Sequence, residues 1–542
     1  MRHDSSPRTL SVASGTGPAR VALRTHRRRI LAWTVPLLGL LAVVAPSYVS
    51  TYPRLSQRQH LISSLGDNAA TRLLYGPLPQ PGTIGQLVAW EMGTYLIVAS
   101  SIMALLLGVS FVRGAEDSGI AELLQACGHT GADRLRGGLV ATAVLAGGFG
   151  VAVAALGLAE TPFVDELTWQ GAVGLGAVTG VSSLCFGLVG ILAGEIADSA
   201  GLAKLLGFLV LAVAFALRAV ANVHGVAALR WLSPLGWKEA EAPYTHDRWW
   251  GLLVFLAVCG VVAVGGRLIG EDREYATAPL HERATSDERL RVRSTLALTW
   301  HLERRRWLSW TAIGAALAAL FGGMSGSLVQ LLQQDASTAD LMSKLTGEHR
   351  LDAAFFSFAG VLLALLVGCY AVLTVLGAGV DEADGLLEGV LACGVARRRP
   401  LAARAAVAVV GSLAMLVVAG AIGAGVTATQ LDGTAAARDF AYVVGQWPAV
   451  LALTGAGVLL VGLRRTFAVA AWLPVAGSAV LVLMGSVLHA PHWLQVGAVF
   501  AHVPDYVDGS RPGTGVFVLL LCFLVCLPVG VGCHSRRDLL PS

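Results

Sequence analysis

Long apolar segments, separated by short polar ones, dominate the chain from residue 30 to residue 533. A helix needs about 20 predominantly apolar residues to cross the hydrocarbon core of a bilayer. Backbone groups inside lipid must be hydrogen-bonded within the segment, so apolar runs of this length predict helices. The alternating strands of about ten residues that a membrane barrel needs are absent from the sequence. The predicted spans are residues 30–49, 88–111, 138–159, 171–194, 202–222, 249–269, 307–330, 353–378, 402–427, 443–463, 467–487 and 514–533.

The composition supports this fold class. Hydrophobic residues make up 55% of the chain and charged residues 14%, whereas about 25% of residues are charged in ordinary soluble domains. The mean hydropathy is +0.67. We therefore expect an all-α polytopic membrane protein with twelve transmembrane helices.

The basic residues predict which side of the membrane each segment faces. With the N-terminus in the cytoplasm, most of the 39 lysines and arginines fall on the cytoplasmic side, as the positive-inside rule requires. Both termini are then cytoplasmic. The net charge of +4 reflects this sidedness, so no nucleic-acid partner is expected. The basic clusters are Arg27 to Arg29, residues 267–306, Arg397 to Arg399, Arg464 with Arg465, and Arg536 with Arg537.

Two polar motifs occur twice. Glu116 to Gly128 reads EDSGIAELLQACG and Glu382 to Gly394 reads EADGLLEGVLACG, with six of thirteen positions identical. Upstream, Arg27 to Thr34 (RRRILAWT) is similar to Arg304 to Thr311 (RRRWLSWT). We interpret the chain as a tandem duplication.

Each copy holds six predicted spans. Because six is even, the second copy enters the membrane in the same sense as the first, which makes a parallel repeat. The predicted organisation is a disordered tail at 1–22, a first half at 23–270, a cytoplasmic linker at 271–303 and a second half at 304–542. The end of the linker, with Leu296, Trp300 and Leu302, predicts a short interfacial helix.

The repeated acidic segments are candidate docking surfaces. Glycine adopts the left-handed conformation at low cost, so Gly119 and Gly385 can each end a membrane helix. A short helix then follows, with Glu122 or Glu388 exposed to the cytoplasm. The alternative is a solvated turn whose charges only keep the loop out of lipid; the duplication favours docking. The candidate residues are Glu116, Asp117, Gly119, Glu122, Glu382, Asp384, Gly385 and Glu388.

The sequence has no nucleotide-binding loop of the P-loop kind. That loop needs a lysine after glycine to reach the terminal phosphates, and the three lysines, Lys204, Lys238 and Lys344, follow other residues. We therefore expect no enzymatic activity and no cofactor in this chain.

Three features together resemble the ABC-2-type permeases. They are the arginine-rich entry helix, the loop E-x-x-G-x-x-E after the second span, and Leu232-Ser-Pro-Leu-Gly-Trp237 before the sixth. The branch that is most similar comprises actinobacterial polyketide-antibiotic and multidrug exporters. The chain departs from the family pattern at Cys127 and Cys393, and its second half has Phe500-Ala-His-Val-Pro504 in place of Ser-Pro-Leu-Gly-Trp.

The resemblance implies a type V exporter-like pseudo-dimer in the bacterial inner membrane. The loop between helices two and three of each half would be the coupling helix. Two ABC ATPase subunits, a homodimer of a separate chain, would bind ATP and Mg. The cargo would be hydrophobic or amphipathic compounds such as antibiotics, drugs or lipids.

Polar residues near the outer end of the fifth span are candidates for the substrate path or an outer gate. Arg218 could pair with Glu239 or Glu241, or its side chain could reach the headgroup layer instead. Glu195 is expected in a solvated turn. The last outer loop holds His489, His492, His502, Asp505 and Asp508, whose spacing matches no metal-ligand pattern, so no metal is expected. The candidates for the path or gate are Arg218, Asn222, Ser233, Pro234 and Trp237.

Two other functions remain open. An ion-coupled secondary multidrug transporter should carry acids or broken helices at the membrane midplane, and the sequence offers none in the middle of its spans. A membrane-embedded glycosyl or lipid transferase needs a carboxylate cluster in an outer loop, but Asp67 is the only acid in the first one.

Overall fold

The chain forms two compact all-helical units, residues 1–288 and 289–542. The computed structural model describes residues 16–65, 72, 75–270, 279–280, 292–334, 351–464, 467, 470–484, 499–502 and 514–537. The division between the units falls inside the segment expected to be a linker.

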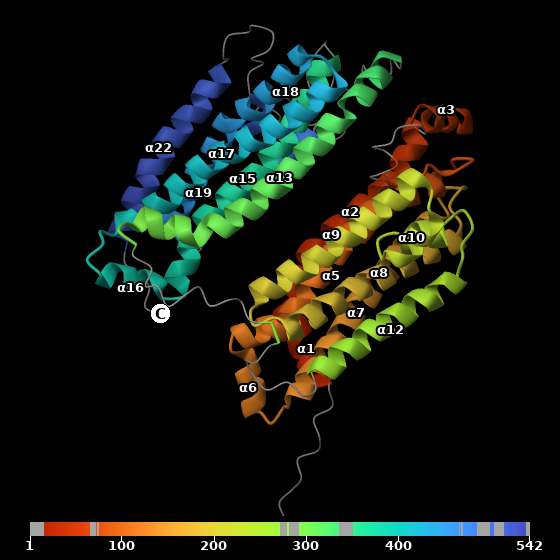
Figure 1. Ribbon diagram of the computed structural model, residues 1–542, viewed down its shortest axis with the longest axis horizontal. Helices are drawn as coiled ribbons and strands as arrows, with labels where there is room; N and C mark the ends of the chain where they lie inside the picture. Colours follow the sequence, from red (N-terminus) through yellow and green to blue (C-terminus); the bar gives the residue numbers. More distant parts are fainter. Residues whose placement is uncertain are drawn as a thin grey trace, which may run out of the picture. The chain divides into compact units, whose positions relative to one another are not determined.

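Unit 1 is a bundle of long helices with short helices at its two ends (Figure 1). One end carries α6, and the opposite end carries α3, α10 and α11. The long helices are α2 (Arg27–Thr51), α5 (Ile84–Asp117), α7 (Gly131–Glu160), α8 (Trp169–Ile196), α9 (Ala200–His224) and α12 (Trp250–Gly270). The short ones are α1 (Thr16–Thr25), α3 (Leu55–Leu65), α6 (Ile120–Ala126), α10 (Ala227–Leu232) and α11 (Trp237–Glu241).

Unit 2 repeats the long-helix bundle, with α16 at one end (Figure 1). Its helices are α13 (Thr295–Gln334), α15 (Leu351–Ala383), α16 (Leu386–Ala392), α17 (Arg398–Gln430), α18 (Gly433–Gly445), α19 (Trp447–Leu463), α20 (Trp472–Met484) and α22 (Thr514–Arg536). A 3₁₀ turn, η2, covers Val499–His502.

Eleven helices among the described residues are long and apolar enough to cross a membrane. They coincide with eleven of the twelve predicted runs. The remaining run, 467–487, contains α20, which has 13 residues; residues 485–487 lie outside the described part. The polytopic helical fold is confirmed, and the twelfth span stays a prediction.

Glycine decides which helices form the centre of unit 1. A side chain at Gly187 or Gly190 would meet α5, and one at Gly150 would meet the backbone of α8 at Gly176 and Gly180. Small residues allow this approach, which matters in lipid because the hydrophobic effect does not drive helices together. Consequently 67% of the apolar stretch of α5 and 72% of that of α8 is buried, against 17% for α9 and for α12.

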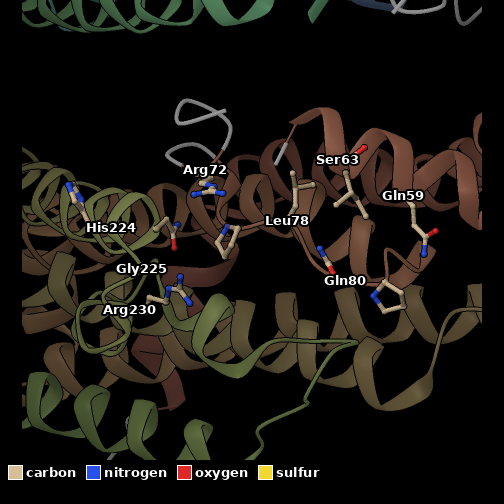
Figure 2. Close-up of a pocket in the computed structure, with 12 residues that line it drawn as sticks. Gln59, Ser63, Arg72, Leu78, Gln80, His224, Gly225 and Arg230 are labelled. Carbon is tan, nitrogen blue, oxygen red and sulfur yellow. The ribbon is translucent and has the colours of Figure 1, made fainter. Parts of the chain in front are cut away.

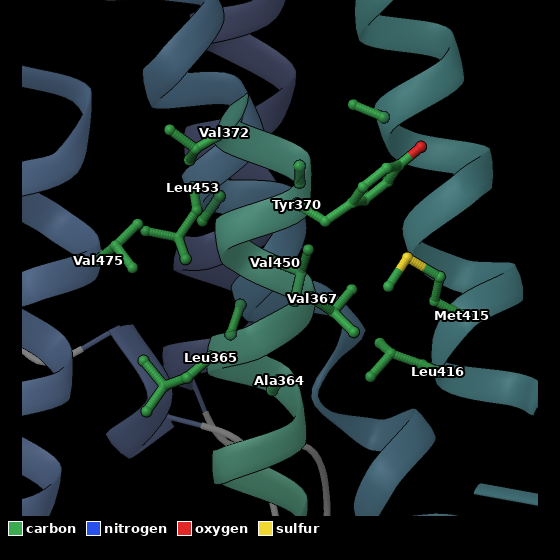
Figure 3. Close-up of a cluster of buried hydrophobic side chains, with 14 of the residues drawn as sticks. Ala364, Leu365, Val367, Tyr370, Val372, Met415, Leu416, Val450, Leu453 and Val475 are labelled. Atoms are coloured by element: carbon green, nitrogen blue, oxygen red, sulfur yellow. The ribbon is translucent and has the colours of Figure 1, made fainter. Parts of the chain in front are cut away.

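The core of unit 2 centres on α15. Figure 3 shows Val367 and Tyr370 of α15 facing Met415 and Leu416 of α17, while Val372 and Leu365 lie toward α19 and α20. Tyr370 is completely buried. The middle of α15 thus packs on α17, α19 and α20 at once.

Two boundaries differ from the sequence prediction. Residues 16–22 were expected in a disordered tail but belong to α1, which packs on α7: Ala19 is buried, and Pro18 lies against Gly137. Residues 295–303 were expected in the linker but form the first turns of α13, which continues without a break. In α1 the small buried side chains pack on α7, whereas in the first turns of α13 Thr299 and Glu303 are buried and Leu296, Trp300 and Leu302 remain exposed.

Candidate functional site

The two repeated acidic segments have the same backbone geometry. Gly119 has φ 74° and Gly385 has φ 70°, both left-handed, and each precedes a helix of seven residues. A second left-handed glycine, Gly128 or Gly394, follows each short helix. The prediction that glycine ends the long helix and starts a short one is confirmed in both units.

Each short helix is anchored by one buried side chain and exposes an acid next to it. Ala121 and Leu387 occupy equivalent positions and are 2% and 6% exposed. The following residues, Glu122 and Glu388, are exposed in the first turn, where a negative charge is favoured by the helix dipole. Each helix also exposes a leucine, Leu123 on α6 and Leu386 on α16. An acid beside an exposed leucine gives each unit a small amphipathic surface.

Glu116 does not belong to that surface, which corrects the sequence interpretation. Its side chain is 4% exposed and forms ion pairs with Arg113, at 2.5 Å, and with Arg134. Arg113 Nε donates to the carbonyl oxygen of Gly194, and Arg134 lies 3.5 Å from Glu195. Glu195 is fully buried and not solvated as expected. This cluster joins the ends of α5, α7 and α8 directly above α6.

Glu382 is also internal, but its partner differs. Its side chain is 4% exposed and pairs with Arg537, which follows α22. Nearby, Arg404 of α17 binds Asp381 at 2.5 Å and Glu303 of α13 at 2.9 Å. Both repeated segments therefore have a buried glutamate at the last turn of the long helix, paired with a different arginine in each unit.

The other two acids of the repeated segments are at the surface. Asp117 accepts a hydrogen bond of 2.9 Å from the backbone nitrogen of Ala200 and so ties the end of α5 to the start of α9. Asp384 is exposed directly before Gly385. Of the eight candidates, Glu122, Glu388, Asp117 and Asp384 thus have exposed side chains, and Glu116 and Glu382 hold the segments in position.

At the opposite end of unit 1, Arg218 forms a buried ion pair with Glu239. The two side chains are 1% and 6% exposed, and their atoms are 2.7 Å apart. The predicted pairing with Glu239 is confirmed, and the alternative, an arginine extended to the headgroups, does not apply. Arg218 also donates to Thr94 of α5 at 3.2 Å, so the pair connects α5, α9 and α11.

Lys238 joins the same cluster. Its Nζ donates to the carbonyl oxygens of Ala89 and Trp90 and to Thr94 Oγ1, at 3.1, 3.1 and 2.9 Å. Burial lowers the pKa of Lys238 to about 8. Burial alone would raise the pKa of Glu239, but the charges of Arg218 and Lys238 outweigh it and hold that pKa at about 2. Two cations share one carboxylate, so the cluster carries a positive charge at neutral pH.

Ser233, Pro234 and Trp237 make internal contacts at this end of unit 1. Ser233 Oγ donates to the carbonyl oxygen of Ala214 at 2.6 Å, and the carbonyl oxygen of Pro234 accepts from Ser182 at 2.9 Å. Trp237 is 1% exposed and stacks on Phe255 with ring centroids 4.4 Å apart. They fix the turn that presents Lys238 and Glu239; their part in a substrate path or outer gate stays a prediction.

Asn222, another of the path or gate candidates, lines a cavity. The cavity has a volume of about 1180 Å³ and lies between α3, the segment before α5, the end of α9, and α10. Figure 2 shows Arg72, Arg230 and His224 around it, with Gln80 and Gln59 farther along. Asn222 is 3% exposed, and neither polar atom of its side chain has a hydrogen-bond partner within the part of the chain that the structure describes.

Glu241 should make the stability of unit 1 pH-dependent. It is fully buried beside Asp247, and burial together with this neighbouring charge raises its pKa to about 8 from an ordinary 4.5. A raised folded-state pKa means stability that is present below pH 4.5 and lost as the pH rises through 8. We expect the free energy of unfolding of unit 1 to fall between pH 5 and pH 9, by a few kcal/mol.

Glu241→Gln should remove most of this pH dependence, as measured by thermal unfolding in detergent. Asp165→Asn, an exposed acid at the same end, should leave it unchanged; a slope retained in Glu241→Gln contradicts the assignment.

Sequence reasoning missed Lys238, Glu195 and Arg404. The sequence could have indicated a role for Lys238, because it is one of three lysines and directly follows the Ser-Pro-Leu-Gly-Trp segment. It could also have indicated a role for Arg404, because a charged residue inside a predicted span is a functional candidate. Glu195 sits in a short polar turn, where exposure is the usual expectation. Of the outer-loop histidines and acids, only His502 in η2 falls within the described residues.

The two helical units, with their eleven candidate spans, define a polytopic membrane protein. Residues 292–533, most of unit 2, match the family described as the C-terminal domain of the multidrug efflux system permease Rv1217c. The whole chain is similar to the multidrug efflux system permease protein Rv1217c of Mycobacterium tuberculosis (strain ATCC 25618 / H37Rv). The two are 30% identical over 545 residues, which cover 98% of this chain and 97% of the relative. The chain belongs to this family of multidrug efflux permeases.

Proposed function

We propose that the chain is the transmembrane permease subunit of an ATP-driven ABC exporter, energised by separate ATPase subunits. One observation carries the proposal: each unit ends a long helix at a left-handed glycine and then presents a seven-residue helix with an exposed glutamate. Each of the two similar units has one such docking surface, so the two surfaces together would bind two equivalent ATPase subunits. These subunits, a homodimer of a separate chain, would bind the ATP and Mg.

The buried ion pairs would transmit a displacement of each short helix to the membrane-spanning helices. Glu116 fixes the end of α5 to α7 through Arg134, and Arg113 extends the contact to α8. Because these contacts hold the ends of α5, α7 and α8 together, a displacement of α6 would displace these three helices as well. In unit 2, Glu382 and Arg404 give α16 a comparable anchorage to α22, α13 and α17. Closure of the two ATPase subunits would then move both units at once.

The location follows from this role. Docking to an ATPase requires α6 and α16 on the cytoplasmic side of the bacterial inner membrane, with both termini in the cytoplasm. The cargo class, hydrophobic or amphipathic drugs, antibiotics or lipids, is supported by the name of the relative, a multidrug efflux permease. The repeated acidic loop favours the ABC-2 type, in its actinobacterial branch.

Co-purification and reconstitution test the proposal. An affinity-tagged chain isolated from its native membrane should bring down a P-loop ATPase. In vesicles, the pair should move a fluorescent hydrophobic drug only with ATP and Mg, and an ATPase whose P-loop lysine is replaced should not support transport. Drug movement or ATP hydrolysis by the purified chain alone would overturn the proposal.

Asp439 favours the second candidate, an ion-coupled multidrug transporter. It is 5% exposed in α18, within the candidate span Gly433–Leu463 but before the predicted run 443–463, and its carboxylate accepts a hydrogen bond of 2.8 Å from Thr427. A buried acid inside a span is a typical ion-coupling group. If this mechanism holds, a proton or sodium gradient alone should drive drug transport by the purified chain, and Asp439→Asn should abolish it.

A further inference from the structure

The cavity at the α10 end of unit 1 has the size and lining of a ligand site. Its volume of about 1180 Å³ slightly exceeds the usual range for drug-sized ligands, about 300–1,000 Å³. Two arginines, a histidine and three amides supply the polar lining: Arg72, Arg230, His224, Gln59, Gln80 and Asn222. Apolar side chains, among them Ile62 and Leu78, line the rest. The lining therefore suits a molecule with one polar end and one apolar part.

The charges around the cavity select a negative ligand. Among the described residues that line it there are two arginines and no aspartate or glutamate. Behind Asn222 lies the cluster in which Arg218 and Lys238 share Glu239, so the wall itself is positive. The amide of Asn222 and the carboxylate of Glu239 both border Gly76, which shows that the cluster and the cavity are adjacent. Because charge is more effective in a poorly hydrated cleft, this arrangement favours anions over cations.

Two polar groups of the lining have no hydrogen-bond partner among the described residues. They are the side-chain amide of Asn222, at both of its polar atoms, and Nε of Arg230, all of them buried. Buried polar groups nearly always have a partner, because leaving one unsatisfied is costly. Asn222 and Arg230 come from consecutive helices, α9 and α10, and converge on the same space. The structure thus offers donors that a bound ligand would satisfy.

We propose that this cavity binds an amphipathic anion, with its carboxylate or phosphate held by Arg230 and Asn222 and its apolar part against Ile62 and Leu78. The ligand accepts hydrogen bonds from the guanidinium and the amide, which an anionic oxygen does well. The site lies wholly within unit 1, and ligand binding there needs neither ATP nor an ATPase subunit. It therefore does not depend on how transport is energised.

Binding to the purified full-length chain tests the site. In nanodiscs of phosphatidylcholine, without ATP or ATPase, decyl phosphate should bind and decyltrimethylammonium should not. Arg230→Gln should weaken decyl phosphate binding about tenfold, because a charge-assisted hydrogen bond is lost. Asn222→Leu should weaken it several-fold. Arg248→Gln, which removes an exposed arginine at the same end but outside the cavity, should change binding less than twofold.

Competition separates the two sources of such a ligand. Displacement of decyl phosphate by inorganic phosphate means that the anionic group suffices, as for a free anion. Displacement by lysophosphatidic acid but not by inorganic phosphate means a lipid-like ligand. Asn222→Leu decides the test if Arg230→Gln is not recovered folded. Equal binding of the cationic probe, or unchanged affinity in a folded Arg230→Gln or Asn222→Leu variant, overturns the proposal.

Discussion

Replacing Glu122 and Glu388 together by lysine is expected to abolish ATP-driven transport while the protein remains folded. Both side chains are exposed in the first turn of the two short helices, so reversing their charge leaves the buried core of each bundle unchanged. It does reverse the charge of both docking surfaces, and like charges placed opposite each other cost several kcal/mol at an interface. The measurements are drug transport in vesicles and stimulation of the partner ATPase.

The single variants and a charge-reversal control sharpen this prediction. Each single variant should retain part of the activity, because one docking surface is still intact. Asp165→Lys reverses an exposed acid at the opposite end of unit 1 and should transport normally. Normal transport by a folded Glu122→Lys, Glu388→Lys double variant would refute the coupling role of both helices.

Arg218→Leu is expected to cause the largest loss of stability of any single substitution at the α10 end of unit 1. The arginine is 1% exposed and 2.7 Å from Glu239. Removing one partner of a buried ion pair leaves the other charge uncompensated and costs about 3–5 kcal/mol. Thermal unfolding in detergent and the fraction of protein that elutes as a folded monodisperse species measure the effect. The exposed control Arg248→Leu should cost about 0.5 kcal/mol or less.

A second substitution should recover part of that loss. Glu239→Gln removes the stranded charge, so Arg218→Leu with Glu239→Gln should be more stable than Arg218→Leu alone. The coupling between the two sites should be about 1–3 kcal/mol. Lys238 keeps its three hydrogen bonds to oxygen atoms outside the pair in this variant. If Arg218→Leu is as mild as the exposed control, the pair does not hold the three helices together.

The local geometry of the repeated segments was predictable because it is a property of a few adjacent residues. A glycine between an apolar run and an acidic turn predicts a left-handed cap, and Gly119 and Gly385 both have that conformation. What their acids do was not predictable in the same way. Glu116 pairs with Arg134, which lies 18 residues further along the chain and beyond α6. Glu382 pairs with Arg537, which lies 155 residues further along the chain.

Which acid pairs with Arg218 could not be decided from the sequence either. The sequence offered Glu239 and Glu241 equally, since both follow Trp237 closely. Residues two apart on a helix point in nearly opposite directions, so the rotation of α11 decides between them. That rotation is set by Trp237 against Phe255 and by Ser233 against α9. Glu239 therefore meets Arg218, and Glu241 is buried beside Asp247.

By itself the sequence determined the membrane class of the protein, the positions of eleven spans and the two short helices that carry exposed glutamates. These features depend on hydrophobicity over about 20 residues and on the backbone freedom of single glycines, which neighbours in the chain fix. Only the tertiary structure decided which polar groups pair, which acids are buried, and that Asn222 and Arg230 face one cavity. Those outcomes depend on how helices rotate and approach each other, and the residues concerned are distant in the chain.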